Sequence, residues 1–267
     1  MNERERIIDF LQALEEGTSA HRESFEWGTV FSHPRFHRVW DLNYLRVEGA
    51  PDVTAEELVG EADRVQSAAG LAHRKVVIDD EELGSRLAPE FKGVGWQVAR
   101  LLMLAHHRPP DRRPEQSADE LSLAEAKLVR ERFLRQDPSI AKDEISIEQL
   151  RDQAEVVVDA VRARFFGARV DGRVASMCEL YSDGSTAQIE AVITLEEHRG
   201  LGLARAVVLR ALNEANRAGH DFVFLLADDD DWPKHLYTKL GFDEVGRAYD
   251  FTLPPSKTDS PSAVGPG

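Results

Sequence analysis

A strand-like run, a glycine-rich turn and an amphipathic helix follow one another in the second half of this chain. The run Glu190-Ala-Val-Ile-Thr194 leads into Gly200 and Gly202, and apolar residues then recur at helical spacing from Ala204 to Ala215. Backbone N–H groups at a helix N-terminus lack partners and carry the positive end of the helix dipole, so they attract phosphate. Glycines ahead of the helix let that phosphate approach the backbone closely. The stretch therefore predicts a phosphate-binding turn.

The spacing of this turn excludes two common nucleotide loops. A dinucleotide fingerprint needs a third glycine where this chain has Arg205, and a Walker loop needs a Gly-Lys-Ser/Thr run that is absent here. The pattern that is present is R-x-x-G-x-A, formed by Arg199, Gly202 and Ala204. It resembles the acyl-CoA pyrophosphate loop of the GCN5-related N-acetyltransferase (GNAT) superfamily.

A second motif supports the same resemblance. The segment Leu236-Tyr-Thr-Lys-Leu-Gly-Phe242 follows a buried-strand pattern at Val223-Phe-Leu-Leu226. It resembles the L-Y-x-K-L-G-F segment that lies beside the acyl thioester in the superfamily. The resemblance implies an α/β (α+β) acyl-CoA N-acyltransferase fold, with a mixed central sheet flanked by helices.

The order of predicted elements agrees with this fold. After the proline-rich segment 107–118, the pattern predicts helices over about 122–136 and 146–162. Turn signals at Asp171-Gly172 and Ser182-Asp-Gly184 then divide a three-strand meander. The resulting order, β-α-α-β-β-β-α-β-α-β, is similar to the GNAT layout.

The limits of helices and domains are predicted from helix-capping patterns and from local composition. Capping boxes mark three starts, at Thr54-Ala-Glu-Glu57, Ser122-Leu-Ala-Glu125 and Ser146-Ile-Glu-Gln149. We expect a GNAT acetyltransferase domain over 119–252, preceded by a linker at 107–118. The tail 253–267 is rich in proline, serine and glycine and is predicted to be disordered.

The N-terminal half, residues 1–106, contains a weak internal repeat of the same pattern. Gly95-Trp96 corresponds to Gly241-Phe242, and earlier segments follow the same element order. Phe91 replaces the tyrosine of the second motif, and Asp52 replaces Arg199 in the turn. The half is therefore interpreted as a degenerate GNAT-like module, in a tandem arrangement; an unrelated α/β domain is the alternative.

The resemblance assigns cofactor contacts residue by residue. The backbone of one strand would pair with the pantetheine arm, and amides of the turn would hold the pyrophosphate. The strand residues are Val192, Ile193 and Thr194, and the turn residues are Arg199, Gly200, Leu201, Gly202, Leu203 and Ala204.

Acetyl transfer to an amine needs a base for the ammonium and an acid for the leaving thiolate. The resemblance makes Tyr237 the general acid, with aromatic packing as its alternative role. Glu190 shares a strand face with Gln188 and Val192, so its carboxylate is a candidate base or a solvated strand residue. The acidic run 228–231 is an alternative base, a docking site for a cationic substrate or a solvated helix entry.

Composition excludes several other classes of protein. A net charge of −15 argues against nucleic acid as a partner, and no apolar run is long enough to span a membrane. Nine histidines form no metal-binding pattern, so no metal is expected. Cys178 is the single cysteine, which fits a reducing cytoplasm, and we expect it to be a small buried side chain.

We therefore expect an N-acetyltransferase that uses acetyl-CoA as co-substrate and transfers the acetyl group by direct attack in a ternary complex. The acceptor would be a small-molecule or peptide amine, whose identity stays open between a small amine, an aminoglycoside-like antibiotic, an amino-acid conjugate and a protein amine. A non-catalytic acyl-CoA-binding or sensing protein is the alternative, followed by a cofactor-free scaffold. The protein is expected to be a monomer or a homodimer.

Overall fold

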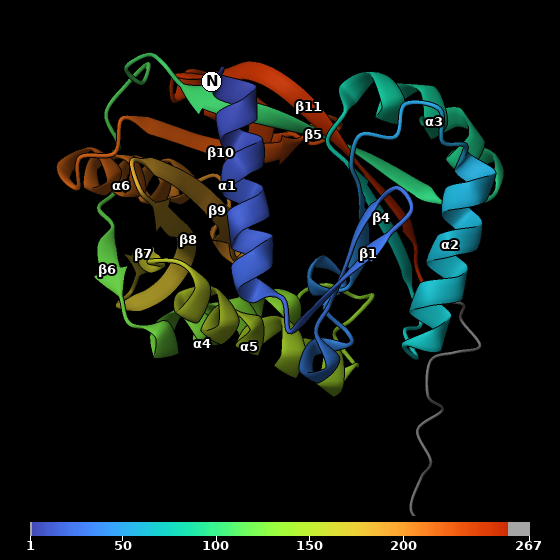
Figure 1. Cartoon of the computed structure of the whole chain (residues 1–267). Coiled ribbons are helices and arrows are strands. Elements are labelled where there is room, and N and C mark those ends of the chain that lie inside the picture. Colours follow the sequence, from blue (N-terminus) through green and yellow to red (C-terminus); the bar gives the residue numbers. More distant parts are fainter. Residues whose placement is uncertain (1, 256–267) are drawn as a thin grey trace, which may run out of the picture. The chain divides into compact units, whose positions relative to one another are not determined.

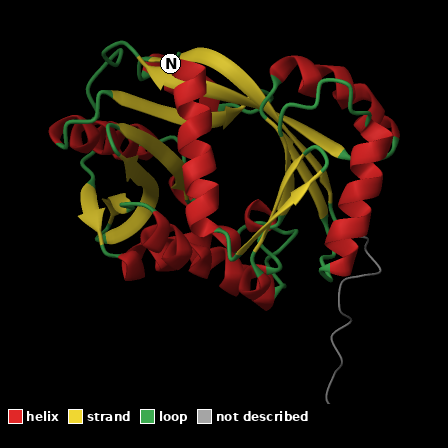
Figure 2. Cartoon of the chain, in the orientation of Figure 1, coloured by secondary structure: helices red, strands yellow, loops and turns green. Residues whose placement is uncertain are grey.

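The computed structural model describes residues 2–255. The chain divides into two compact units, and neither is continuous in sequence. Of the described residues, the first unit contains 2–18 and 102–246. The second unit contains 19–101 and 247–255. Figure 1 shows the chain coloured along its sequence, and Figure 2 shows its helices and strands.

The first unit is a mixed sheet with helices on both faces. Its strand order is β11-β5-β10-β9-β8-β7-β6. Strands β6 to β9 are antiparallel neighbours, whereas β9 and β10 are parallel. The elements are α1 (Glu3–Thr18), β5 (Gln97–His106), β6 (Asp119–Leu121), α4 (Leu123–Leu134), α5 (Glu144–Ala160), β7 (Arg164–Val170), β8 (Arg173–Asp183), β9 (Thr186–Thr194), η3 (Glu196–His198), α6 (Leu203–Arg217), β10 (Phe222–Asp228), α7 (Pro233–Lys239) and β11 (Phe242–Leu253).

The predicted order β-α-α-β-β-β-α-β-α-β is confirmed from β6 to β11. The capping box at Ser122 is also present, since Ser122 and Glu125 bond to each other's backbone N–H groups. The predicted helix start at Ser146 is wrong. Helix α5 begins at Glu144, and Asp143 caps it by accepting the N–H of Ser146 at 3.1 Å.

The first β-turn of the meander has the conformation that its sequence predicts. Asp171 and Gly172 adopt positive φ angles of 49° and 78°, as a two-residue hairpin turn between β7 and β8 requires. The next turn, after β8, contains Gly184 at φ 53°. These turns connect the antiparallel strands of the meander, whose last strand, β9, pairs in parallel with β10.

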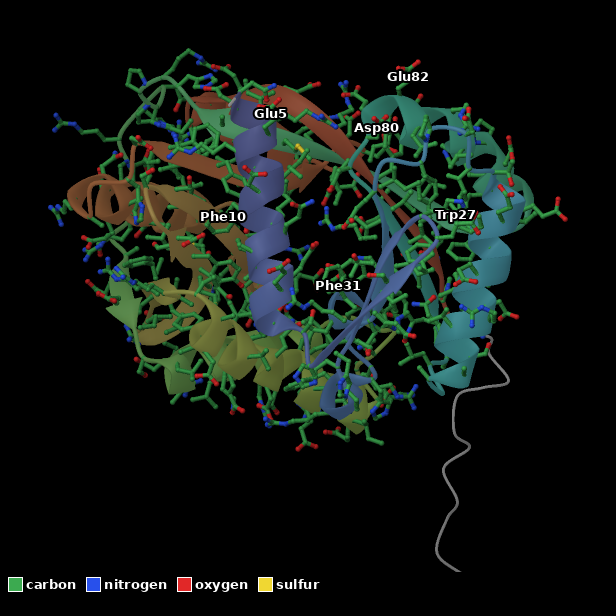
Figure 3. The ribbon with its side chains drawn as sticks, in the orientation of Figure 1. Glu5, Phe10, Trp27, Phe31, Asp80 and Glu82 are labelled. Atoms are coloured by element: carbon green, nitrogen blue, oxygen red, sulfur yellow. The ribbon has the colours of Figure 1, made fainter. Side chains whose placement is uncertain are left out.

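The core of the first unit lies between the sheet and α6. Helix α6 buries Val207, Val208 and Ala211 against alternate strand residues such as Leu225. Helix α1 covers the opposite face, where Phe10 meets the ring of Phe224 edge-on at 5.2 Å (Figure 3). Because α1 and α6 cover opposite faces, side chains of β9 and β10 point alternately toward the face with α6 and toward the face with α1.

The second unit repeats the later part of the first unit's element order, because its elements β1, β2, β3, α2, β4, α3 and β5 follow one another as β7, β8, β9, α6, β10, α7 and β11 do. Its strand order is β1-β2-β3-β4-β11-β5, and β3 and β4 are parallel neighbours, as β9 and β10 are in the first unit. The capping box at Thr54 is present at the start of α2. The elements are β1 (His21–Phe25), β2 (Gly28–Ser32), η1 (Pro34–Phe36), η2 (Trp40–Leu42), β3 (Tyr44–Val47), α2 (Ala55–Ala68), β4 (Arg74–Ile78) and α3 (Glu81–Gly93).

Aromatic rings fill much of the core of the second unit. The ring of Phe91 stacks on Phe251 at 4.2 Å and meets Trp96 edge-on at 5.0 Å. Asp80, which Figure 3 labels at the start of α3, caps this helix. Its side chain accepts the N–H of Leu83 at 2.8 Å. Gly95, at φ 88°, joins α3 to β5 as Gly241, at φ 97°, joins α7 to β11. The two glycines thus hold corresponding places in the repeated order.

The compact units differ from the predicted ranges 1–106 and 119–252. Strands β5 and β11 each contribute to both units, because the divisions fall after Leu101 and after Gly246. The segment 107–118 has no helix or strand, and it lies wholly inside the first unit. The predicted tail begins at the last residue of β11, and its residues 256–267 lie outside the described part. Within that part, no helix is long and apolar enough to cross a membrane.

Candidate functional site

The parallel strands β9 and β10 of the first unit separate before either of them ends. Their paired residues are Phe222–Phe224 on β10 and Thr186–Gln188 on β9. Beyond these pairs β10 continues to Asp228 and β9 to Thr194. Two diverging parallel strands expose backbone N–H and C=O groups that a ligand can satisfy.

A bulge in β9 lies at the point of separation. The β8–β9 register shifts between Met177, which faces Ile193, and Glu179, which faces Glu190. Ala191 adopts a φ of 48° there, which is uncommon for a residue with a side chain. Such bulges bend a strand and redirect its side chains. The bulge therefore turns β9 away from β10 at residues 191–192.

A pocket of about 250 Å³ occupies the gap between the separated strands. It brings together Glu190 and Val192 from β9 with Tyr237 from α7, three of the residues singled out from the sequence. Residues of β10 and Pro233 complete its wall. The candidate acid, the candidate base and one of the predicted pantetheine-binding residues therefore share a single pocket.

The side chain of Tyr237 is largely buried, with 6% of its surface exposed. Burial first, and then the charge of Glu190, raise the pKa of its phenol well above the usual value. A phenol with a raised pKa stays protonated at neutral pH. A proton is therefore present in the pocket for a leaving thiolate, and the raised pKa makes the phenol a weaker acid than a solvent-exposed tyrosine.

Glu190 is held by groups of its own strand. Its Oε2 accepts a hydrogen bond from the Nε2 of Gln188 at 2.7 Å, and its Oε1 accepts the N–H of Ala191 at 3.1 Å. The second bond comes from the bulge residue, so the irregular backbone also orients the carboxylate. Both bonds leave the carboxylate at the pocket wall.

Three residues near Glu190 were not singled out from the sequence. Glu179 of β8 lies directly across from Glu190, is 1% exposed and pairs with Arg130 of α4. Tyr181 donates its hydroxyl proton to Glu179 at 2.5 Å. One signal could have revealed this cluster, namely a single charged residue, Glu179, within the otherwise uncharged run Val174–Leu180.

The glycine turn has the geometry of a phosphate cradle. Gly200 and Gly202 adopt φ angles of 81° and 76°, and a Cβ at either position would meet only open space. Gly202 is the N-cap of α6, so the first N–H groups of the helix point out of its N-terminus. Arg199 precedes the turn in extended conformation and is a candidate contact for the phosphate.

Arg205, which occupies the place of a third glycine, has a structural role. Its side chain is 6% exposed and its Nη1 bonds to the Oδ1 of Asp111 at 2.5 Å. The same nitrogen donates to the carbonyl oxygen of Arg112 at 3.3 Å. The segment 107–118 is thereby attached to the first turn of α6.

The acidic run 228–231 serves mainly to organise the start of α7. Asp228 accepts the N–H of Asp230 at 2.8 Å, and Asp231 accepts the N–H of Trp232 at 2.7 Å. Asp229 pairs with Lys234 at 3.1 Å. Among the three readings of this run, these bonds favour the helix entry.

The corresponding strands of the second unit stay together. Strands β3 and β4 pair from Leu45 with Val76 up to Val47 with Ile78, which are the last residues of both strands. Arg46 and Asp79 form a buried ion pair at this end. The gap that holds the pocket in the first unit is thus closed here.

Metal-ligating side chains and the single cysteine are two further features that could form a site. Across residues 2–255, no group of three or more histidine, cysteine, aspartate or glutamate side chains could hold a metal ion. Cys178 is buried, and its thiol donates to the carbonyl oxygen of Val207 at 3.2 Å. Burial raises the pKa of that thiol, which suits a packing role.

Comparison with known proteins agrees with this geometry. Residues 127–242 match the profile of the acetyltransferase (GNAT) family. The matched range runs from α4 to the first residue of β11 and so includes the separated strands, the glycine turn and Tyr237. The resemblance to the GNAT superfamily is thereby confirmed for this part of the chain. No curated protein matches the sequence.

Solved structures share the fold across most of the chain. A GCN5-related N-acetyltransferase from Kribbella flavida is 19% identical, with a TM-score of 0.62 over 96% of this chain and 97% of its own. A functionally unknown conserved protein from Staphylococcus epidermidis is 15% identical, with a TM-score of 0.66 over 88% of this chain and 93% of its own.

A third similar structure is a tandem GNAT protein from the clavulanic acid biosynthesis pathway. It is 19% identical and has a TM-score of 0.53 over 79% of this chain and 76% of its own. At these identities the similarity shows the fold. The predicted fold class, a mixed sheet flanked by helices in the GNAT manner, is confirmed.

Proposed function

We propose that the first unit is an acetyl-CoA-dependent N-acetyltransferase that acts on a primary amine. The observation that carries the proposal is the single pocket where β9 and β10 separate, because it is lined by both Glu190 and Tyr237. The family match supports acyl transfer, and the glycine turn ahead of α6 supports a phosphate-bearing cofactor. The single cysteine of the chain fits a reducing cytoplasm.

In this proposal the cofactor extends from the glycine turn into the pocket. Amides from Arg199 to Ala204 hold the pyrophosphate, while the unpaired end of β9 from Val192 to Thr194 binds the pantetheine arm. The thioester then lies between Glu190 and Tyr237. Glu190 removes one proton from the ammonium, directly or through water, and the neutral amine attacks the thioester carbon. The C–S bond breaks, Tyr237 protonates the departing thiolate, and the second proton of the attacking nitrogen restores the Tyr237 phenol.

The experiment that tests this function is a panel of primary amines assayed for free-thiol release from acetyl-CoA. We expect acetyl-CoA binding by calorimetry and acceptor-dependent thiol release with at least one class of amine. Binding without release from any acceptor would favour the alternative, a non-catalytic acyl-CoA-binding or sensing protein. Absence of binding at millimolar acetyl-CoA would contradict both functions.

Replacing Gly202 by glutamate should weaken acetyl-CoA binding by about 100-fold, equivalent to about 2.8 kcal/mol. The change puts a carboxylate where the pyrophosphate is expected, at a position with open space around it. Isothermal calorimetry gives the dissociation constant directly. Gly202→Ala is the matched control, because it introduces the same backbone strain at φ 76° without the charge. Equal affinities for the two variants would show that the turn does not hold phosphate.

We further propose that the second unit is a degenerate GNAT-like module that holds no acyl-CoA. Strands β3 and β4 pair to their ends, and the buried pair of Arg46 and Asp79 lies at the end where a ligand would enter. Phe91 holds the place of the tyrosine and packs in the core. Calorimetry should therefore give one binding site per chain.

A further inference from the structure

Five polar side chains form a cluster on one face of the first unit's sheet. They are Arg130, Glu179, Tyr181, Gln188 and Glu190, and we call them the Glu179 cluster. Glu179 faces Glu190 across β8 and β9, and Tyr181 faces Gln188. The alternate residues Cys178, Leu180, Ala187 and Ile189 lie in the core against α6, so the cluster occupies the opposite face.

Two carboxylates directly opposite each other in a sheet repel. The repulsion is stronger here because Glu179 is 1% exposed and little water screens its charge. An unassisted pair of this kind ordinarily shares a proton, so one of its members is neutral. A neutral Glu190 could not act as a base.

Arg130 supplies the charge that such a pair needs. Its Nη2 is bonded to the Oε1 of Glu179, while Tyr181 bonds to Oε2. Burial opposes the charge of Arg130, but attraction to Glu179 and, more weakly, to Glu190 raises the pKa of the guanidinium. One buried cation therefore acts on both carboxylates.

We propose that Arg130 is a positioning residue that keeps both carboxylates of the Glu179–Glu190 pair ionised, and so keeps Glu190 available as the base for the acceptor amine. This inference rests on the proposed function only in its last step. The electrostatic coupling itself belongs to the folded protein without any ligand.

Other groups around Glu190 bear on its titration. They include Tyr181 on β8, Tyr237 on α7 and Asp228 at the end of β10, which lines the same pocket. The two tyrosines have raised pKa values and are neutral below pH 8. Arg130, Glu179 and Asp228 are therefore the charged groups named here that lie around Glu190.

The decisive measurement is a carbon-13 NMR titration of the full chain labelled at glutamate carboxyls, with the Glu190 signal identified by its loss in Glu190→Gln. In Arg130→Met, the pKa of Glu190 should rise by about one unit or more, because two opposed carboxylates then lack their cation. In Glu179→Gln, the pKa should fall by about one unit, because Arg130 then acts on Glu190 alone.

The opposite signs of these shifts are what the inference requires. An unchanged pKa of Glu190 in Glu179→Gln, or a rise in it, would overturn the inference.

If Arg130→Met does not fold, the double variant Arg130→Met with Glu179→Gln replaces it, because no buried charge is left unpaired. In the double variant, Glu190 should titrate above its value in Glu179→Gln, and an equal value would overturn the coupling. Arg130→Lys should retain most of the wild-type pKa.

Measurements of enzyme activity against pH distinguish this inference from the proposed function. With an acceptor that supports thiol release, the acidic limb of the kcat profile should move in the same direction as the pKa of Glu190 in each variant. Shifted pKa values together with an unmoved acidic limb would show that Glu190 is not the base. Shifted pKa values without thiol release from any acceptor would instead refute the acetyltransferase function and leave the coupling established.

Discussion

Replacing Tyr237 by phenylalanine is expected to lower turnover by about 100-fold or more, while the affinity for acetyl-CoA stays within a factor of about two. The change removes one hydroxyl group from the pocket that Tyr237 shares with Glu190 and leaves the ring in place against Phe242. The departing thiolate then lacks its proton donor. Single-turnover thiol release measures the chemical step, and calorimetry measures binding.

Tyr249→Phe provides the control for this experiment. Tyr249 is equally buried, at 5% exposed, and belongs to the second unit. Its variant should show wild-type turnover, so a shared loss would indicate a general effect of removing a buried hydroxyl. Unchanged turnover in Tyr237→Phe would rule out Tyr237 as the acid and leave it as a packing residue.

The second large effect is expected on stability, from Gly241→Ala. Gly241 has a φ of 97°, and a Cβ there would lie 1.8 Å from the carbonyl oxygen of Arg108. The N–H groups of His107 and Arg108 also donate to Gly241 at 2.9 and 3.1 Å, so this backbone cannot withdraw without losing two hydrogen bonds. We expect the free energy of unfolding, measured by urea denaturation, to fall by more than about 4 kcal/mol.

Gly219→Ala is the matched control in the same unit. Gly219 has a φ of 86°, but a Cβ there meets nothing within 4 Å. Its variant therefore carries only the backbone strain, about 1–3 kcal/mol. If the two variants lose the same stability, the close approach of Arg108 to Gly241 does not restrain the folded chain.

Local patterns predicted the elements of the first unit well, because the signals lie within a few residues of the structure they specify. The turn at Asp171-Gly172 needs two adjacent residues that tolerate positive φ, and the cap at Ser122 needs one glutamate three residues later. The prediction that α5 starts at Ser146 failed because two neighbouring residues carry the same local signal. Asp143 and Ser146 are both good cap residues, and the structure uses the earlier one, which adds residues 144–146 to the start of the helix.

The candidate site was predictable to the extent that its residues carry motifs. The motifs indicated the glycine turn and Tyr237, and strand alternation indicated Glu190. Arg130 could not be found in this way, because it reaches Glu179 from a helix 49 residues earlier in the chain. Neither Arg130 nor Glu179 belongs to a sequence motif that would mark it as a site residue. Long-range pairings of this kind depend on the fold and not on sequence spacing.

The sharing of β5 and β11 between the two units has a consequence for synthesis of the chain. The core of the first unit contains Leu102 and Leu104 from β5 as well as Phe242 from β11. The core of the second unit contains Tyr249 and Phe251, which lie near the far end of β11. Domains commonly fold one after another as they leave the ribosome, the N-terminal one first. Here the N-terminal segment must wait for β11, so neither core can close until that strand has been synthesised.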